Sequence, residues 1–321
     1  MYKYSVAAAI LCILSIKSFS QDSAKTGSSV VDSSNTTQTI DLSQKAVSSS
    51  NTETFSSSSL TSKPIHSTDN VYRISWAADA PITGVGLGLS VYGLHLIQNK
   101  SNLTEAQANA KNRNDVNGFD RHSAGFYSES ANNASYIPFF TSFGMPLVVM
   151  AIDKNERSQA GKITVMYVES LAITSALYTI TAGSVNRSRP LVYPDKNGNF
   201  RAPLSTRESK NSQRSFYAGH TAATASASFF AAKVFSDMNP DSKFKPYIWV
   251  IAAALPAVTG YYRYKSGEHF LSDNILGYVI GGASGILVPQ LHKTSKEFRK
   301  MTFAPAIGQG YKGIDIAYTF R

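Results

Sequence analysis

Long apolar segments separated by shorter polar connections dominate the chain from residue 79 onward. Six of them are long enough for helices, and their small residues and lack of strict apolar–polar alternation favour helix over strand. They cover residues 79–98, 134–152, 163–186, 216–234, 246–262 and 271–291. The sequence therefore predicts an all-α fold, a bundle of six helices.

Two short stretches at the borders of the helical region follow another pattern. Residues 71–76 and 313–320 alternate apolar and polar positions with a period of two, which is typical of β-strands. We expect short flanking strands there, and the two could pair with each other.

The first 70 residues differ from the rest of the chain. Residues 1–20 combine Lys3, a short apolar run over 6–14 and small residues before position 21, which is the pattern of a secretory signal peptide. Residues 21–70 are nearly half Ser or Thr and show no apolar periodicity, so we predict a disordered tether. A folded, exported domain should then occupy residues 71–321.

Cysteine content and charge narrow the chemistry. Cys12, the only cysteine, lies in the predicted signal peptide, so the mature chain would have no disulfide, cysteine nucleophile or thiolate metal site. The net charge of +10 suggests an anionic partner such as a phosphorylated substrate or an acidic lipid, although a basic surface alone would also explain it. No nucleic-acid-binding motif is apparent, and export argues against such a partner.

Membrane association is a further expectation. Segment 134–152 has no charged residue, and segment 271–291 has only Asp273, whereas other segments are interrupted or rich in Ala and Ser. If all six helices spanned the membrane, the positive-inside rule would place the arginine-rich connection after residue 186 in the cytoplasm. A periplasmic bundle, or one that is partly embedded in the membrane, avoids this placement.

Three groups of residues carry the candidate chemistry. Arg187 and Arg189 end the third segment at Pro190, and guanidinium groups can hold phosphate through paired hydrogen bonds. Gly219 and His220 open the fourth segment, where backbone N–H groups attract anions and a histidine could pass a proton to a leaving oxygen. Each group alone is more often structural.

The third group is the most specific. Arg263 is followed by His269 and Asp273, and the last two are four residues apart, so on a helix they would share a face and can form a hydrogen bond. A carboxylate on one imidazole nitrogen leaves the other as a nucleophile or base. In an up-and-down bundle all three groups fall at the same end.

At these residues the chain resembles the type 2 phosphatidic acid phosphatase and vanadium haloperoxidase superfamily, whose motifs run Lys-x6-Arg-Pro, Pro-Ser-Gly-His and Ser-Arg-x5-His-x3-Asp. The corresponding sequences here are Ala182-x6-Arg189-Pro190, Tyr217-Ala218-Gly219-His220 and Tyr262-Arg263-x5-His269-x3-Asp273. The resemblance covers roughly 79–291, with the motif-bearing core at about 163–291. It implies an α-helical bundle, as the segments do independently.

The resemblance also implies a mechanism. His269 would attack phosphorus and form a phosphohistidine, Asp273 would orient it, and His220 would protonate the leaving alkoxide. Arg189, Arg263 and the Gly219 backbone would hold the phosphoryl oxygens, with no cofactor or metal required.

Three positions depart from the motifs. Ala182 replaces a lysine, Ala218 a serine and Tyr262 a serine, and Arg187 could stand in for the missing lysine. Losing two donors to phosphate would weaken catalysis, by roughly tenfold to a thousandfold each.

We therefore expect a hydrolase of the acid or lipid phosphate phosphatase type. Its substrate would be a phosphomonoester or diphosphate, either lipid-linked or a small phosphoester. One alternative is a catalytically impaired protein that binds anionic lipid or phosphate. The other is a vanadate-dependent haloperoxidase, against which the missing lysine and serine argue.

Overall fold

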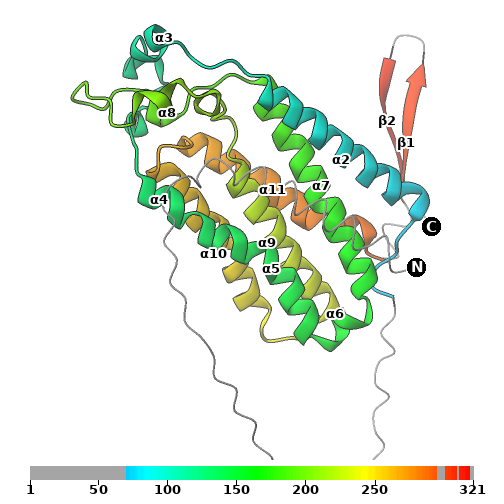
Figure 1. Ribbon diagram of the computed structural model, residues 1–321. Coiled ribbons are helices and arrows are strands. Elements are labelled where there is room, and N and C mark those ends of the chain that lie inside the picture. Colours follow the sequence, from blue (N-terminus) through cyan, green and yellow to red (C-terminus); the bar gives the residue numbers. More distant parts are fainter. Residues whose placement is uncertain (1–69, 295–300, 309–310, 319–321) are drawn as a thin grey trace, which may run out of the picture. The chain divides into compact units, whose positions relative to one another are not determined.

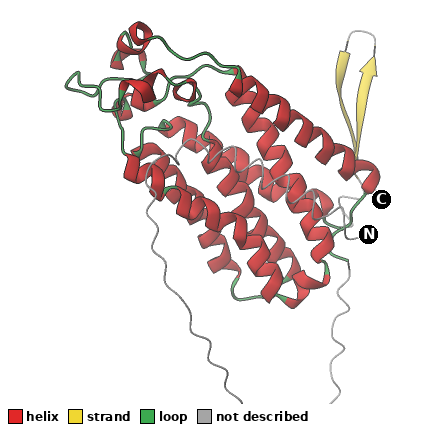
Figure 2. Cartoon of the chain, viewed as in Figure 1, coloured by secondary structure: helices red, strands yellow, loops and turns green. Residues whose placement is uncertain are grey.

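The computed structural model describes residues 70–294, 301–308 and 311–318. The predicted signal peptide, and the predicted tether apart from residue 70, lie outside the described residues and stay predictions. Six long helices form the described part of the fold (Figures 1 and 2), which confirms the all-α prediction. They are α2 (Trp76–Gln98), α5 (Tyr136–Ile152), α7 (Ala160–Ser184), α9 (Gly219–Met238), α10 (Lys245–Lys265) and α11 (Leu271–His292).

Short helical turns lie in the connections. Four are α-helical: α3 (Glu105–Asn109), α4 (Glu129–Ala134), α6 (Lys154–Ser158) and α8 (Leu204–Glu208). Four more are 3-10 turns: η1 (Arg113–Asp115), η2 (Arg121–Ser123), η3 (Pro190–Val192) and η4 (Lys210–Gln213). Each predicted helical segment corresponds to one long helix, with ends shifted by a few residues.

Helix α9 is the centre of the bundle. It contacts α5, α7, α10 and α11, and 16 of its 20 residues are buried. Its Ala and Ser residues allow neighbouring helices to approach closely, and the buried hydroxyls bond within the bundle. Ser226 Oγ, for example, lies 3.0 Å from Ser170 Oγ and 3.0 Å from Thr174 Oγ1. A helix that is polar by composition is therefore the most buried one.

Glycines on α11 allow it to pack backbone to backbone against α9. A Cβ atom built on Gly277 would lie 2.5 Å from the carbonyl oxygen of Ala218, and one on Gly281 would lie 1.9 Å from that of Ala222. No side chain fits at such distances. This contact brings the first turn of α11 beside the first turn of α9, where the Ala218 N–H donates to the Asp273 carbonyl over 3.1 Å.

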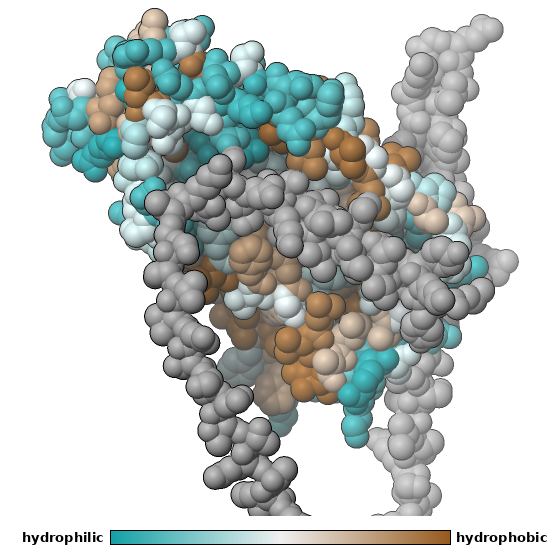
Figure 3. Space-filling model, viewed as in Figure 1, coloured by the Kyte–Doolittle hydropathy of each residue, from teal (hydrophilic) through white to brown (hydrophobic). Residues whose placement is uncertain are grey.

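Polar connections gather at one end of the bundle. The segment before α4 and the segment between α7 and α9 bond to each other, with Leu103 N donating to Glu208 O and Gly125 N donating to Pro190 O, both over 2.8 Å. Figure 3 shows a mostly hydrophilic surface around α3 and α8. We call residues 99–128 and 185–218 the polar cap.

Apolar side chains are exposed on the long helices outside the cap. Helices α2 and α5 together carry Trp76, Ile82, Val85, Leu89, Val91, Tyr92, Ile137, Phe140, Leu147, Val148 and Ile152. Hydrophobic surface lies over the helices below the cap in Figure 3. Four stretches are long and apolar enough to cross a membrane, namely 76–98, 129–152, 160–184 and 271–292. These features indicate a membrane-associated protein.

The prediction of flanking strands was wrong for the first stretch and incomplete for the second. Tyr72 forms a single antiparallel bridge with Lys293, and α2 already begins at Trp76. Strand β2 (Tyr311–Tyr318) does form, but its antiparallel partner is β1 (Met301–Gly308). A neighbour that is two residues away along the chain forms a hairpin at a much smaller cost in loop entropy than a distant segment does.

Candidate active site

The three predicted groups of residues come together where the polar cap meets the ends of the long helices. Residues 187–189 run beside 212–215, with Arg189 N donating to Ser212 O over 2.7 Å and Ser215 N donating to Arg187 O over 2.9 Å. The loop between α10 and α11 closes against this pair, since Leu191 N donates to Gly267 O over 3.1 Å. Chain segments far apart in sequence therefore place their side chains at one end of the bundle.

Gly267 shapes the loop that carries the candidate nucleophile. Its φ of +76° is a conformation that side chains other than glycine rarely adopt, and a Cβ there would lie 1.8 Å from the Phe126 carbonyl oxygen. The turn lets the chain leave α10 after Lys265 and re-enter α11 at Leu271 with His269 facing inward, 1% exposed.

The tautomer of His269 follows from its hydrogen bond. Nδ1 lies 2.6 Å from the carbonyl oxygen of Ser215. A carbonyl oxygen only accepts, so Nδ1 carries the proton and Nε2 keeps its lone pair in the neutral ring. Burial and the charges of Arg189 and Arg263 lower the pKa of His269 well below its usual range. The ring is therefore neutral at pH 7, as a nucleophile requires.

The predicted hydrogen bond between Asp273 and His269 was wrong. His269 lies before α11, not on it, so the spacing of four residues does not place the two side chains on one helical face. Instead Asp273 Oδ2 accepts from Ser215 Oγ over 2.6 Å and from the Phe270 N–H over 3.0 Å. Asp273 thus fixes Ser215, whose carbonyl in turn orients His269.

Arg187 is engaged by two carboxylates. Its guanidinium is held by Asp120, with 2.7 Å between Nη2 and Oδ2, and by an ion pair with Asp273. It also lies over the ring of Phe270 at 4.6 Å. Both carboxylates are fully buried, so Arg187 compensates their charges and supports the loop. That Arg187 also holds phosphate stays a prediction.

Arg189 and Arg263 converge, as the motif resemblance implies, but on a carboxylate. Arg263 Nη2 donates to Glu268 Oε2 over 2.8 Å, and Arg189 forms an ion pair with the same oxygen. Arg263 Nη1 is also held by Asn132 Oδ1 of α4 at 2.5 Å. The two guanidiniums are thus oriented and almost buried, at 8% exposure for Arg189 and 3% for Arg263.

Sequence reasoning missed Glu268. Despite its burial, the charges of Arg189, Arg263 and Arg214 hold the pKa of its carboxyl below its usual range, so Glu268 is ionised at neutral pH. Its position directly before His269 was the available signal, but nothing in the sequence says toward which group it points. The carboxylate bridges the two arginines that the resemblance assigns to phosphate.

His220 lies in the first turn of α9, 6% exposed, with Phe139 and Tyr136 against its ring at centroid distances of 4.6 and 5.4 Å. His220 also contributes to lowering the pKa of His269, after burial, Arg189 and Arg263. Gly219 begins the same helix with the ring of Tyr178 against it, 2.6 Å from where a Cβ would lie. The first backbone N–H groups of a helix have no partner within it and suit an anion.

Two of the three motif departures lie in closely packed places. Ala182 and Ala218 are fully buried, the first on α7 and the second as the N-cap of α9.

Arg214 supplies a third positive charge that sequence reasoning did not single out, and it lowers the pKa of His220 together with burial, Arg263 and Arg189. Arg214 forms a parallel backbone bridge with Arg187, where residues 187–189 run beside 212–215. This bridge brings Arg214 to the site.

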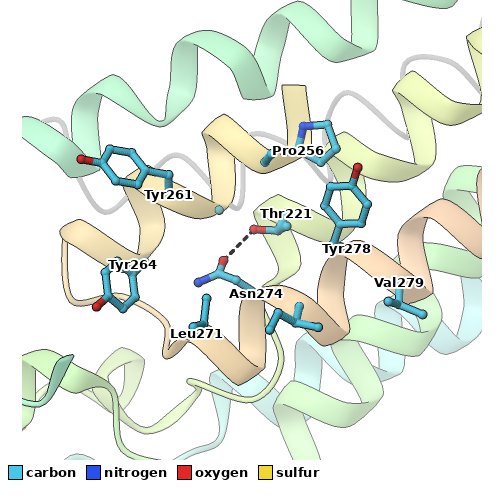
Figure 4. A pocket seen from close by; sticks show the side chains of 11 residues that line it. Thr221, Pro256, Tyr261, Tyr264, Leu271, Asn274, Tyr278 and Val279 are labelled. Atoms are coloured by element: carbon cyan, nitrogen blue, oxygen red, sulfur yellow. Dashed lines mark hydrogen bonds between the residues drawn. The ribbon is translucent and has the colours of Figure 1, made fainter. Parts of the chain in front are cut away.

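A mostly apolar groove of about 500 Å³ opens beside the site, between α9, α10 and α11. Figure 4 shows Pro256, Tyr261 and Tyr264 from α10 facing Leu271, Tyr278 and Val279 from α11. Its polar lining residues include Thr221 and Asn274, and Thr221 Oγ1 donates to Asn274 Oδ1 over 2.8 Å. Thr221 follows His220 and Asn274 follows Asp273, so the groove lies at the same end of the bundle as the catalytic candidates.

A family model agrees with the resemblance seen in the motifs. Residues 163–297 match the family model described as the PAP2 superfamily, which confirms that resemblance over the segment carrying all three motifs. Among solved structures, the chain is similar to a transmembrane PAP2 type phosphatidylglycerolphosphate phosphatase from Bacillus subtilis. The likeness has 19% identity and a TM-score of 0.42, and covers 67% of this chain and 98% of that one. No curated protein matches.

Proposed function

We propose that this protein is a phosphatase that hydrolyses a phosphomonoester or diphosphate, with a lipid-linked substrate, through a phosphohistidine intermediate. The PAP2 match supports the class of reaction. The observation that carries the proposal is the neutral His269, whose Nε2 lone pair lies in a buried site with two oriented guanidiniums.

In the first step His269 Nε2 attacks phosphorus, and the bond between phosphorus and the ester oxygen breaks. His220 gives its proton to the leaving alkoxide. Arg189, Arg263 and the backbone N–H groups at Gly219 stabilise the charge on the equatorial oxygens, as preorganised donors do at a transition state. Phosphate binding offsets the positive charges that lower the pKa of His220, so the ring is more readily protonated when the substrate is bound.

In the second step water attacks the phosphohistidine. His220, now neutral, accepts a proton from that water, the bond between nitrogen and phosphorus breaks, and inorganic phosphate leaves. Asp273 acts on this cycle through Ser215 and is a positioning residue, because it touches neither the imidazole of His269 nor the phosphate cradle.

The groove supports a lipid substrate. It lies at the same end of the bundle as the catalytic residues and is mostly apolar, so it could hold part of an acyl or isoprenyl chain while the phosphate lies between the arginines. The apolar surface of the long helices would keep the protein where such substrates are found. We further propose export to the periplasmic side, which is supported by the signal-like residues 1–20.

One observation favours a second candidate, a protein that binds anions but turns over slowly. Glu268 lies between the arginines, and Ala182 and Ala218 leave the cradle without two donors. Turnover separates the two functions. We expect the purified protein to release phosphate from an aryl phosphate or a polyprenyl diphosphate, and His269→Ala to abolish that release. Binding of phosphate or lipid without turnover on either substrate would instead support the second candidate.

A further inference from the structure

Three ionisable side chains meet at the other end of the bundle from the candidate active site. Asp79 lies in the first turn of α2, Glu169 in α7, and His292 is the last residue of α11. Nε2 of His292 is 3.3 Å from Asp79 Oδ1 and 3.5 Å from Glu169 Oε2. From Asp273 to His292 the helix rises about 28 Å, so this cluster is separate from the catalytic residues.

The hydrogen bonds of the cluster leave three acceptors facing one another. His292 Nδ1 is 2.8 Å from the carbonyl oxygen of Val288, so Nδ1 carries the proton of the neutral ring. Nε2 then presents a lone pair to two carboxylate oxygens. Neither Nε2 nor Glu169 Oε2 has a hydrogen-bond partner among the described residues, and Glu169 is only 4% exposed. Such an arrangement needs a cation or a proton at its centre.

Charge favours the cation. When both are ionised, Asp79 and Glu169 carry two negative charges, and neither forms an ion pair with a lysine or arginine in the part of the chain that the structure describes. A protonated His292 would offset only one of these charges and would leave the other uncompensated between apolar helices, which is unfavourable. A divalent ion offsets both.

The spacing fits a tetrahedral ion. Zinc binds imidazole nitrogen and carboxylate oxygen at about 2.0–2.2 Å, so two of its tetrahedral ligands lie about 3.4 Å apart. The two distances from Nε2 are 3.3 and 3.5 Å, and all three ligand atoms lie within 4.8 Å of one another. Further hydrogen bonds orient two of the proposed ligands. The Ser75 N–H donates to Asp79 Oδ2 over 2.7 Å, and His292 Nδ1 donates to the Val288 carbonyl oxygen.

We propose that Asp79, Glu169 and His292 form a structural site for a divalent ion of the zinc type, with a solvent molecule as fourth ligand. The ion would join α2, α7 and α11. At the same place, the segment before α2 forms backbone hydrogen bonds with the end of α11 and the segment after it. Arg73 N donates to His292 O over 2.9 Å, and Thr294 N donates to Val71 O over 2.8 Å. This site is independent of the proposed phosphatase function.

The test uses the full chain, purified in detergent without a histidine tag and stripped with a chelator. Zn²⁺ binding is measured by calorimetry, and Co²⁺ is added separately to record the visible absorption of tetrahedral coordination. The variants are His292→Ala and the isosteric Glu169→Gln. The matched control is His95→Ala, because His95 is an exposed histidine on α2.

We expect one equivalent of Zn²⁺ per wild-type chain, tetrahedral Co²⁺ absorption, and a rise in the thermal midpoint on Zn²⁺ addition, since a ligand of the native state stabilises it. Both variants should lose all three effects, and His95→Ala should keep them. Absence of binding in the wild type would overturn the proposal. So would binding that persists in Glu169→Gln and His292→Ala, and in either case the cluster is a proton-sharing ion pair.

Discussion

Glu268 is the residue that most affects how the candidate site would bind phosphate. Its carboxylate accepts hydrogen bonds from Arg189 and Arg263, the two groups proposed for the phosphoryl oxygens. A carboxylate and a phosphate in the same place compete for the donors and repel each other. An entering phosphate must therefore displace Glu268 or bind with fewer contacts.

We predict that Glu268→Gln binds inorganic phosphate roughly tenfold more tightly than the wild type, because the amide keeps the shape and removes the negative charge. The inhibition constant of phosphate against aryl phosphate hydrolysis measures this, or direct calorimetry if turnover is too slow. Glu129→Gln, at an exposed residue in the first turn of α4, is the matched control. Unchanged or weaker binding in Glu268→Gln would show that the carboxylate supports the arginines and does not compete with phosphate.

At this scale the sequence predicted the identities of the central residues better than their contacts. The spacing of Arg263 and His269 indicated phosphoryl chemistry, and the structure brings both to one place. The partner of His269 could not be predicted, because the hydrogen bond to Ser215 joins residues 54 positions apart. Asp120 was missed for the same reason, since only the fold brings it to Arg187 and Ser272.

Helix α11 is the element on which the site depends most, because its glycines set how closely α9 approaches. Gly281→Ala would place a methyl group 1.9 Å from the Ala222 carbonyl oxygen, within backbone that cannot rotate away. We predict a loss of roughly 1–3 kcal/mol of stability, together with lower activity, because the helices must separate. A thermal melt in detergent measures the stability.

Gly88→Ala is the control for this substitution. Gly88 lies on α2, and a Cβ atom added there would have no other atom within 4 Å, so alanine should leave the melt unchanged or raise its midpoint slightly. Equal midpoints for Gly281→Ala and the wild type would show that α9 and α11 do not pack as closely as described.

Helices were predictable as elements, because each apolar segment is long and bounded by polar residues or proline. Their burial was not. The polar composition of α9 gave no sign that it would be the central helix, since its burial depends on Ser and Ala fitting between four neighbours. The first flanking strand failed because period two over six residues is weak evidence when a helix begins at Trp76.

For the whole molecule, the groove and the apolar helices together suggest that the substrate arrives from a lipid phase. We predict that Ala257→Trp, which fills the exposed side of the groove, raises the KM for a long-chain lipid phosphate roughly fivefold or more. Hydrolysis of a small aryl phosphate should change little, because it does not need the groove.

Ala254→Trp is the matched control for the groove, since Ala254 is exposed on the same helix but does not line the groove. Steady-state kinetics with both substrates separates the outcomes. A parallel loss on both substrates in Ala257→Trp would point to a disturbed fold. No change on either would mean that the lipid chain lies elsewhere.

The proposed function depends most on the covalent phosphorylation of His269. The most direct measurement is to quench the wild-type protein during turnover of a ³²P-labelled substrate and to measure phosphate bound to protein. We predict a label that is lost in acid and stable in base, as a phosphohistidine is, and that is absent from His269→Ala. Turnover without any trapped label, or an equal label in His269→Ala, would contradict the account.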